Sequence, residues 1–195
     1  MKVVIIKYNA GNYASVNFAL ERLGVNAIIT DNFDEIHSAS KVIFPGVGAA
    51  GSVMKYLREK KLDQVVINLK QPVLGICLGM QLMCESSEEG DVDCLGIFNQ
   101  KVKHFQSTDL KVPQVGWNKI YDLKSDLFSG LENEYAYFVH SYYAESSANT
   151  IATVDYEIPY SAALQKNNFY ATQFHPEKSG DFGSRILENF IKSCK

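Results

Sequence analysis

A cysteine with a glycine two residues before it and another two residues after it is the part of this chain best suited to chemistry. Cys77 lies between Gly75 and Gly79, which is the spacing of a nucleophile elbow with cysteine in place of serine. The apolar run 72–76 predicts a strand buried on both faces, and the Leu-, Met- and Gln-rich run 78–86 predicts a helix. A helix N-terminus favours a thiolate, which attacks carbonyl carbons. The simpler alternative is a small packing cysteine.

A histidine and a glutamate two residues apart could supply the base that such a thiol needs. His175 and Glu177 flank Pro176, directly after the strand-like segment 169–174. Proline favours an extended conformation in the residue before it, and alternate side chains of an extended segment project to one side. Cys77, His175 and Glu177 then become nucleophile, base and orienting carboxylate. Taken alone, a histidine before proline would be read as a turn residue.

A glycine-rich loop could complete the machinery for acyl transfer. The apolar strand predicted at 41–44 enters the loop 45–51, which contains three glycines. A tetrahedral intermediate needs two N–H donors near its oxyanion. Leu78, the residue after the cysteine, could supply one, and Val47 or Gly48 the other. An ordinary strand-to-helix turn is the alternative for this loop.

These segments must be positioned by an α/β fold with a mainly parallel central sheet, flanking helices and extra antiparallel strands in the C-terminal half. Strands are predicted at 2–7, 25–30, 41–44 and 72–76, alternating with helices at 12–23, 50–59, 62–69 and 78–86. Further strands are predicted at 101–105, 117–121, 135–143, 150–155, 160–165 and 169–174, with a closing helix at 183–192 and an acidic loop at 85–93. Reactive groups of such folds lie at the carboxyl ends of parallel strands.

Together with the segments 8–12, 113–118, 138–142 and 175–179, these motifs resemble class I, triad-type glutamine amidotransferases. Among them, the glutaminase subunits of imidazole glycerol phosphate synthases are the most similar. Residues 13–15, Tyr-Ala-Ser, depart from the Leu-Arg-Ser common in that family, in a loop expected at the partner surface.

The resemblance implies hydrolysis of glutamine to glutamate and ammonia through a cysteinyl thioester, without a cofactor or metal. The ammonia would pass to a (β/α)8-barrel cyclase subunit in a heterodimer. That cyclase would form imidazole glycerol phosphate and aminoimidazole carboxamide ribotide in histidine biosynthesis. Nothing in this chain resembles an acceptor site, and ammonia released into water becomes ammonium, so a second polypeptide is expected.

The resemblance also assigns roles residue by residue. It assigns glutamine binding to Gly46, Gly48, Gln81, Glu89, Val115, Ser141 and Tyr142, and the cyclase interface to Asn12, Trp117, Tyr137 and Lys178. Each has a plainer alternative, such as a helix-covering Gln81, a solvated Glu89 or a core Tyr137. The three remaining histidines, His37, His104 and His140, are interpreted as structural.

The composition sets limits on the function. The chain of 195 residues suits one domain covering 1–195, with 46% hydrophobic residues for the core. A net charge of −3 gives no indication of nucleic-acid binding, and no apolar run reaches membrane-spanning length. The four cysteines lack paired metal spacing, so an active thiol in the cytoplasm is expected.

Three other functions compete with this interpretation. The same glutaminase could serve an anthranilate, aminodeoxychorismate or sugar-amination synthase, although Trp117 and the Lys178–Ser179 pair favour the cyclase. The chain could instead be a catalytically silent regulatory subunit. A cysteine hydrolase acting on peptides is the third alternative.

Overall fold

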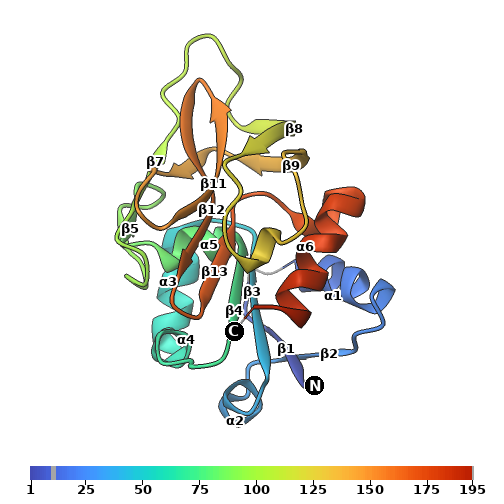
Figure 1. The fold of residues 1–195 in the computed structure, drawn as a ribbon. Helices are drawn as coiled ribbons and strands as arrows, with labels where there is room; N and C mark the ends of the chain where they lie inside the picture. Colours follow the sequence, from blue (N-terminus) through green and yellow to red (C-terminus); the bar gives the residue numbers. More distant parts are fainter. Residues whose placement is uncertain (10–11, 195) are drawn as a thin grey trace.

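The computed structural model describes residues 1–9 and 12–194. Within them, nine strands form one sheet in the order β2-β1-β3-β4-β13-β12-β11-β8-β9 (Figure 1). Its parallel part contains β2 (Ala27–Thr30), β1 (Val3–Ile6), β3 (Lys41–Gly46), β4 (Val73–Cys77) and β13 (Phe169–Thr172). Its antiparallel part contains β12 (Ile158–Lys166), β11 (Thr150–Tyr156), β8 (Gln114–Tyr121) and β9 (Tyr135–His140). The expected mainly parallel sheet with added antiparallel strands is confirmed.

Helices cover both faces of the parallel part, which explains why its strands are apolar on both sides. Helices α1 (Tyr13–Arg22) and α6 (Gly180–Lys192) lie on one face, and α3 (Ala50–Glu59), α4 (Leu62–Ile67) and α5 (Leu78–Met83) on the other (Figure 1). Strand β1 shows the two-residue period directly. Its Val3 and Ile5 enter the core under α1 and α6, whereas Val4 and Ile6 enter the core under α3, α4 and α5.

A second, smaller sheet lies beside the carboxyl-terminal end of β4. Among the described residues it contains β10 (Tyr142–Ala144), β7 (Lys101–His104), β5 (Ser86–Ser87) and β6 (Val92–Asp93). Two expectations were wrong here. The single strand predicted at 135–143 is divided at Ser141 between the two sheets, and the loop predicted at 85–93 contains two short strands.

Most other predicted elements form near their expected places. The helix predicted at 78–86 ends earlier, at Met83, because the following residues enter the second sheet. Helix α2 (Phe33–His37) was not predicted, although Asn32 accepts a hydrogen bond from the Glu35 N–H and caps it. Two 3-10 turns were also missed, η1 (Asp126–Phe128) and η2 (Pro176–Lys178).

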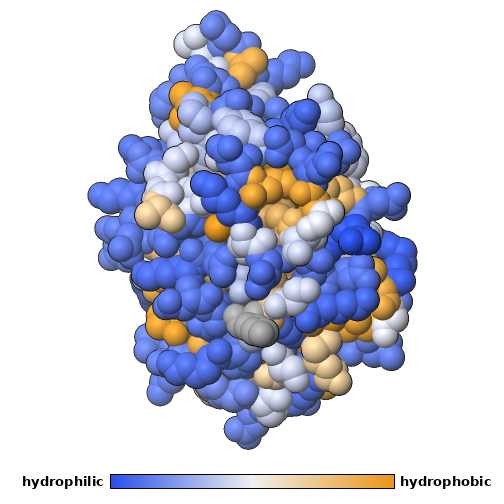
Figure 2. Space-filling view, viewed as in Figure 1, coloured by the Kyte–Doolittle hydropathy of each residue, from blue (hydrophilic) through white to orange (hydrophobic). Residues whose placement is uncertain are grey.

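The carboxyl ends of three neighbouring parallel strands meet at one edge of the sheet. Gly46 at the end of β3 pairs with Cys77 at the end of β4, and β13 ends beside β4 on its other side. The outer surface in this view is mostly hydrophilic, with a broad apolar area between β9 and α6 and smaller apolar areas elsewhere (Figure 2). No helix within the described residues has the length and apolar character needed to cross a membrane.

Candidate active site

Cys77 lies at the sharp turn where β4 becomes α5. It has φ 53° and ψ −110°, a backbone conformation that costs a residue other than glycine on the order of 1–3 kcal/mol. The turn directs the side chain out of the strand, and the residue is 7% exposed. The strain is maintained by the sheet and helix packed on either side, as expected where a fold fixes a reactive group.

Gly79, which follows Cys77, and Gly46, at the end of β3, are both required by close backbone approaches. A Cβ atom on Gly79 would lie 1.9 Å from the carbonyl oxygen of Phe44, and one on Gly46 would lie 2.6 Å from the Gly79 nitrogen. The end of β3 therefore touches the first turn of α5 directly. This contact holds the loop after β3 next to Cys77.

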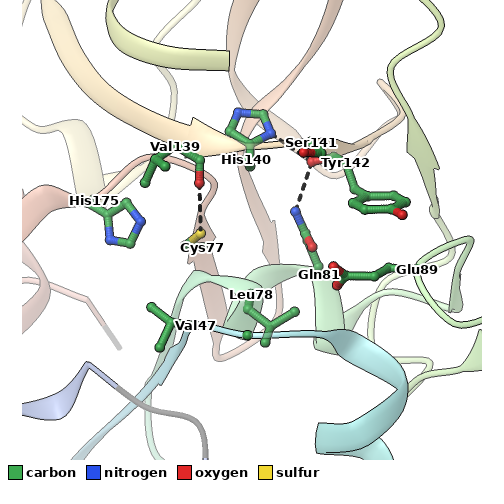
Figure 3. Close-up of a pocket in the computed structure, with 11 residues that line it drawn as sticks. Val47, Cys77, Leu78, Gln81, Glu89, Val139, His140, Ser141, Tyr142 and His175 are labelled. Atoms are coloured by element: carbon green, nitrogen blue, oxygen red, sulfur yellow. Dashed lines mark hydrogen bonds between the residues drawn. The ribbon is translucent and has the colours of Figure 1, made fainter. Parts of the chain in front are cut away.

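A cavity of about 270 Å³ opens beside the sulfur (Figure 3). It is lined by Val47, Gly48, Cys77, Leu78, Gln81, Glu89, Val139, His140, Ser141, Tyr142 and His175. These residues come from the loop after β3, the end of β4, α5, the turn between β5 and β6, the junction of β9 with β10 and the segment between β13 and η2, so the cavity depends on both sheets. Its size is at the small end of ligand pockets.

His175 and Glu177 form a buried pair at this cavity. His175 Nδ1 lies 2.8 Å from Glu177 Oε1, with side chains 3% and 1% exposed. His175 is extended as expected, but Glu177 is not: it lies on the 3-10 turn η2. The expected meeting of the two side chains is therefore reached through a tighter turn than the sequence argument assumed.

The other ring nitrogen of His175 faces the cavity and the sulfur of Cys77 (Figure 3). This atom, Nε2, is buried and has no hydrogen-bond partner within the described residues. The Cys77 sulfur instead donates to the Val139 carbonyl oxygen over 4.0 Å and accepts from Gln173 Nε2 over 3.8 Å. The imidazole is thus free to exchange a proton with whatever enters the cavity.

Charge around the ring raises its basicity. Burial alone would lower the pKa of His175, but the negative charge of Cys77 and the contact with Glu177 outweigh burial and raise that pKa to about 10. His175 is therefore favoured as an imidazolium at rest. Its ring holds a proton ready for a leaving group.

The three expected oxyanion-hole residues meet at the cavity. Val47, Gly48 and Leu78 all line it. The Leu78 N–H is the first of α5 and has no partner within that helix. Gly48 has φ 104°, a conformation that other residues rarely adopt. Their role as donors stays a prediction.

Of the residues expected to bind the substrate, five line the cavity: Gly48, Gln81, Glu89, Ser141 and Tyr142. Gly46 and Val115 do not. Gly46 is buried under α5, and the Val115 side chain is 60% exposed on β8, opposite Val139. Glu89 also caps helix α3, because its Oε2 accepts from the Ala50 N–H at 2.8 Å.

His140 lines the cavity but is held in place by hydrogen bonds of its own. Its Nδ1 lies 2.7 Å from the Tyr142 carbonyl oxygen and its Nε2 lies 3.1 Å from the Tyr160 hydroxyl. Burial, with a further contribution from His175, lowers the pKa of His140 to about 4 despite the Tyr142 contact. A neutral ring with its proton on Nδ1 follows, in agreement with its interpretation as structural.

Three of the four residues expected at the partner interface form a continuous surface near η2. Trp117 pairs with Tyr137 across β8 and β9, with ring centroids 6.0 Å apart. Lys178 Nζ lies 5.9 Å from the centre of the Tyr137 ring. Trp117 is 52% exposed, so it is not a core residue. Asn12 stands at the N-cap position of α1, where its side chain accepts from the Ser15 hydroxyl and not from a helix N–H.

Two residues that contact the nucleophile were missed by the sequence reasoning. Val139 contributes only a backbone carbonyl, for which side-chain type gives no signal. Gln173 could have been found, because it lies two residues before His175 in a segment expected to be extended. Phe174 between them points the other way and is fully buried in the core.

Residues 5–194 match the family described as glutamine amidotransferase class-I. The chain therefore belongs to the class I glutamine amidotransferase family. Two solved structures share its fold: one titled as a glutamine amidotransferase has a TM-score of 0.75 at 17% identity and covers 96% of each chain. The structure of PurLQS from Thermotoga maritima has a TM-score of 0.73 at 15% identity, covering 100% of this chain and 99% of that one.

Within the family, the chain groups with the HisH subunits of imidazole glycerol phosphate synthase. The HisH subunit of Bacteroides fragilis is 59% identical over 195 residues, which cover 98% of this chain and 100% of the relative. The HisH subunit of Pasteurella multocida is 46% identical over 99% of this chain and 98% of the relative.

Proposed function

We propose that this chain hydrolyses glutamine and supplies the ammonia to a synthase subunit that makes imidazole glycerol phosphate in histidine biosynthesis. The observation that carries the proposal is the cavity itself. The cavity brings together a strained cysteine, a buried His–Glu pair and several polar groups, and its volume suits an amino acid. The relatives that match this chain over nearly their full length are named as subunits of that synthase.

The polar end of the cavity fits the α-amino group of glutamine. Both N–H groups of the Gln81 amide are already used, by the Tyr142 carbonyl at 2.9 Å and the Gln173 oxygen at 3.0 Å. Gln81 Oε1 is left as an acceptor. Together with the Glu89 carboxylate, which lies on the same side of the cavity (Figure 3), it favours an ammonium group.

In the first step the Cys77 thiolate attacks the side-chain amide carbon, and the carbonyl oxygen becomes an oxyanion held by the N–H groups of Leu78 and the Val47–Gly48 segment. His175 donates its proton to the amide nitrogen. The C–N bond breaks, and ammonia leaves behind a γ-glutamyl thioester. The now neutral imidazole takes a proton from water, which attacks the thioester. Glutamate is released and the thiolate is restored.

The partner is a (β/α)8-barrel cyclase subunit in a heterodimer, docked on Trp117, Tyr137 and Lys178. Ammonia becomes protonated in bulk water and loses its nucleophilicity, so this docking must shelter its transfer. The aromatic pair and exposed cation on this face suit a hot-spot contact. We place this one-domain enzyme in the cytoplasm, because Cys77, like the other three cysteines of the described chain, is a free thiol.

The test is a synthesis assay with the assembled complex and either glutamine or ammonium salt as the nitrogen source. Cys77→Ser should abolish glutamine-dependent synthesis and leave ammonia-dependent synthesis unchanged. Cys94→Ser is the matched control, because Cys94 is outside the cavity. Glutamine use by the Cys77→Ser complex would disprove the assignment of Cys77 as the nucleophile. Failure of the wild-type chain to bind a barrel cyclase would favour another synthase partner.

A further inference from the structure

We infer that Gln173 is a positioning residue for the nucleophile, with its side-chain N–H directed at the Cys77 sulfur by a hydrogen-bond chain that starts at the Tyr142 carbonyl. This inference rests on the proposed glutaminase function and deepens it. Gln173 is fully buried, and its Nε2 lies 3.8 Å from Cys77 Sγ. It comes directly after β13, the strand beside the one that carries Cys77.

The chain of contacts fixes which end of each amide faces which neighbour. A backbone carbonyl oxygen can only accept, so the Gln81 atom 2.9 Å from Tyr142 O must be the amide nitrogen. The same nitrogen lies 3.0 Å from the Gln173 side chain, and this neighbour must therefore be the Gln173 oxygen. The Gln173 nitrogen is then turned toward Cys77. An oxygen at that position would repel a thiolate.

The first member of this hydrogen-bond chain, the Tyr142 carbonyl, is itself held by two hydrogen bonds. The Tyr142 carbonyl oxygen has two lone pairs, and it accepts from Gln81 and from the His140 ring, whose Nδ1 is 2.7 Å away. At the other end, the Gln173 backbone N–H donates to the Ala162 carbonyl at 2.8 Å. Both ends of Gln173 are thus held, and rotation of its amide would break two hydrogen bonds.

The location of Gln173 gives it a role that His175 cannot take. Both side chains reach the region of Cys77: Gln173 Nε2 contacts the sulfur, and the charge of Cys77 acts on the His175 ring. His175 exchanges the proton, whereas the Gln173 amide has no proton to give up near neutral pH. An uncharged donor to a thiolate lowers the free energy of the charged sulfur without competing for the substrate amide.

The test is the pH profile of Cys77 alkylation by iodoacetamide in the full-length chain, read by mass spectrometry of the Cys77 peptide. Gln173→Met keeps the length and removes the N–H. We expect the midpoint of its profile to move to higher pH by about one unit, because a hydrogen bond to a charged group is lost. Gln173→Glu places a carboxylate beside the sulfur and should suppress alkylation at neutral pH at least tenfold.

Gln100→Met is the matched control. Gln100 is also a buried glutamine, but it is outside the cavity and its side chain makes only a 3.5 Å contact with Asn149 within the described residues. Its profile should coincide with that of the wild type. If Gln173→Met loses its cooperative thermal transition, Gln173→Asn carries the same test, because it retains the amide but withdraws it by one methylene.

An unchanged midpoint in a folded Gln173 variant would overturn the inference. Alkylation needs neither glutamine nor a partner, so this result is independent of the glutaminase assay. A wild-type complex without glutamine turnover would instead refute the proposed function, whatever the alkylation profiles show.

Discussion

Tyr137 and His175 are joined by a closed ring of hydrogen bonds through Ser179. The His175 N–H donates to the Tyr137 carbonyl at 2.9 Å, and the Tyr137 N–H donates to Ser179 Oγ at 3.0 Å. The Ser179 hydroxyl in turn donates to the His175 carbonyl at 2.7 Å. Tyr137 lies on the surface that carries Trp117 and Lys178, so a strand of the proposed partner face is bonded directly to the proposed base.

Ser179→Ala should therefore reduce glutamine turnover as well as stability. The variant loses two buried hydrogen bonds, which should cost about 1–3 kcal/mol of unfolding free energy. We expect kcat for glutamine in the complex to fall about tenfold or more, because the base loses its alignment. Steady-state kinetics and thermal unfolding measure the two effects.

Ser184→Ala is a close control for that variant. The Ser184 hydroxyl makes the same kind of contact, to the carbonyl four residues earlier, Gly180 O at 3.0 Å, but on the exposed side of α6. Its turnover and stability should match the wild type. Equal losses in the two variants would show that Ser179 acts only as a helix residue.

Glu177→Gln should reduce glutamine turnover by roughly 10²- to 10⁴-fold, because the ring loses its orienting carboxylate. The pKa of His175 is raised above 6.5 to about 10, so the imidazolium stabilises the fold fully below about pH 6.5. That contribution is lost as the pH rises toward 10. The variant should show a smaller alkaline loss of stability, measured by denaturant unfolding from pH 6 to 10. An identical alkaline loss would contradict the assignment.

His140 should make the fold sensitive to acid. Its pKa is lowered from 6.5 to about 4, so between these pH values the unfolded chain binds the proton and the folded chain does not. Stability should fall by about 3 kcal/mol as the pH drops through this interval. His140→Gln removes the titrating group, and its stability deficit relative to wild type should shrink by that amount between pH 7 and 4. A constant deficit in urea unfolding would contradict the prediction.

Gly79→Ala should prevent a stable elbow. The added Cβ would lie 1.9 Å from a backbone oxygen of β3, which no side-chain rotation relieves. We expect a loss of at least about 3 kcal/mol in unfolding free energy. Gly51→Ala is the control, because Gly51 lies in α3 and its Cβ would meet only ordinary contacts, the nearest with Gly90 Cα at 3.5 Å. It should be neutral or slightly stabilising in the same thermal melt.

The parallel half of the fold could be predicted because its strands and helices carry strong periodic signals. The second sheet could not. Its strands β5 and β6 are two residues long, which is too short for an alternation of apolar and polar residues to be recognised. The division at Ser141 was missed because β9 and β10 are separated by one residue, and both sides of it have strand-forming side chains.

At the site, side-chain types and spacing predicted the meeting of Cys77 with the His175–Glu177 pair, since the carboxyl ends of neighbouring parallel strands converge. The backbone path to Glu177 was wrong, because Pro176 starts a 3-10 turn instead of continuing the extended segment. The contribution of Val139 depends on a carbonyl from the far end of the large sheet. Local sequence carries no information about such a contact.

Strand β4, which ends at the nucleophile, is completed on one side by β3 and on the other by β13, which comes much later in the sequence. Chains emerge from the ribosome N-terminus first, so Cys77 is exposed to the cell well before its base has been translated. A stalled or truncated nascent chain keeps an open β4 edge and a thiol without its imidazole. The reactive centre is thus assembled only after β13 and His175 have been translated, and copies that lack them consume no substrate.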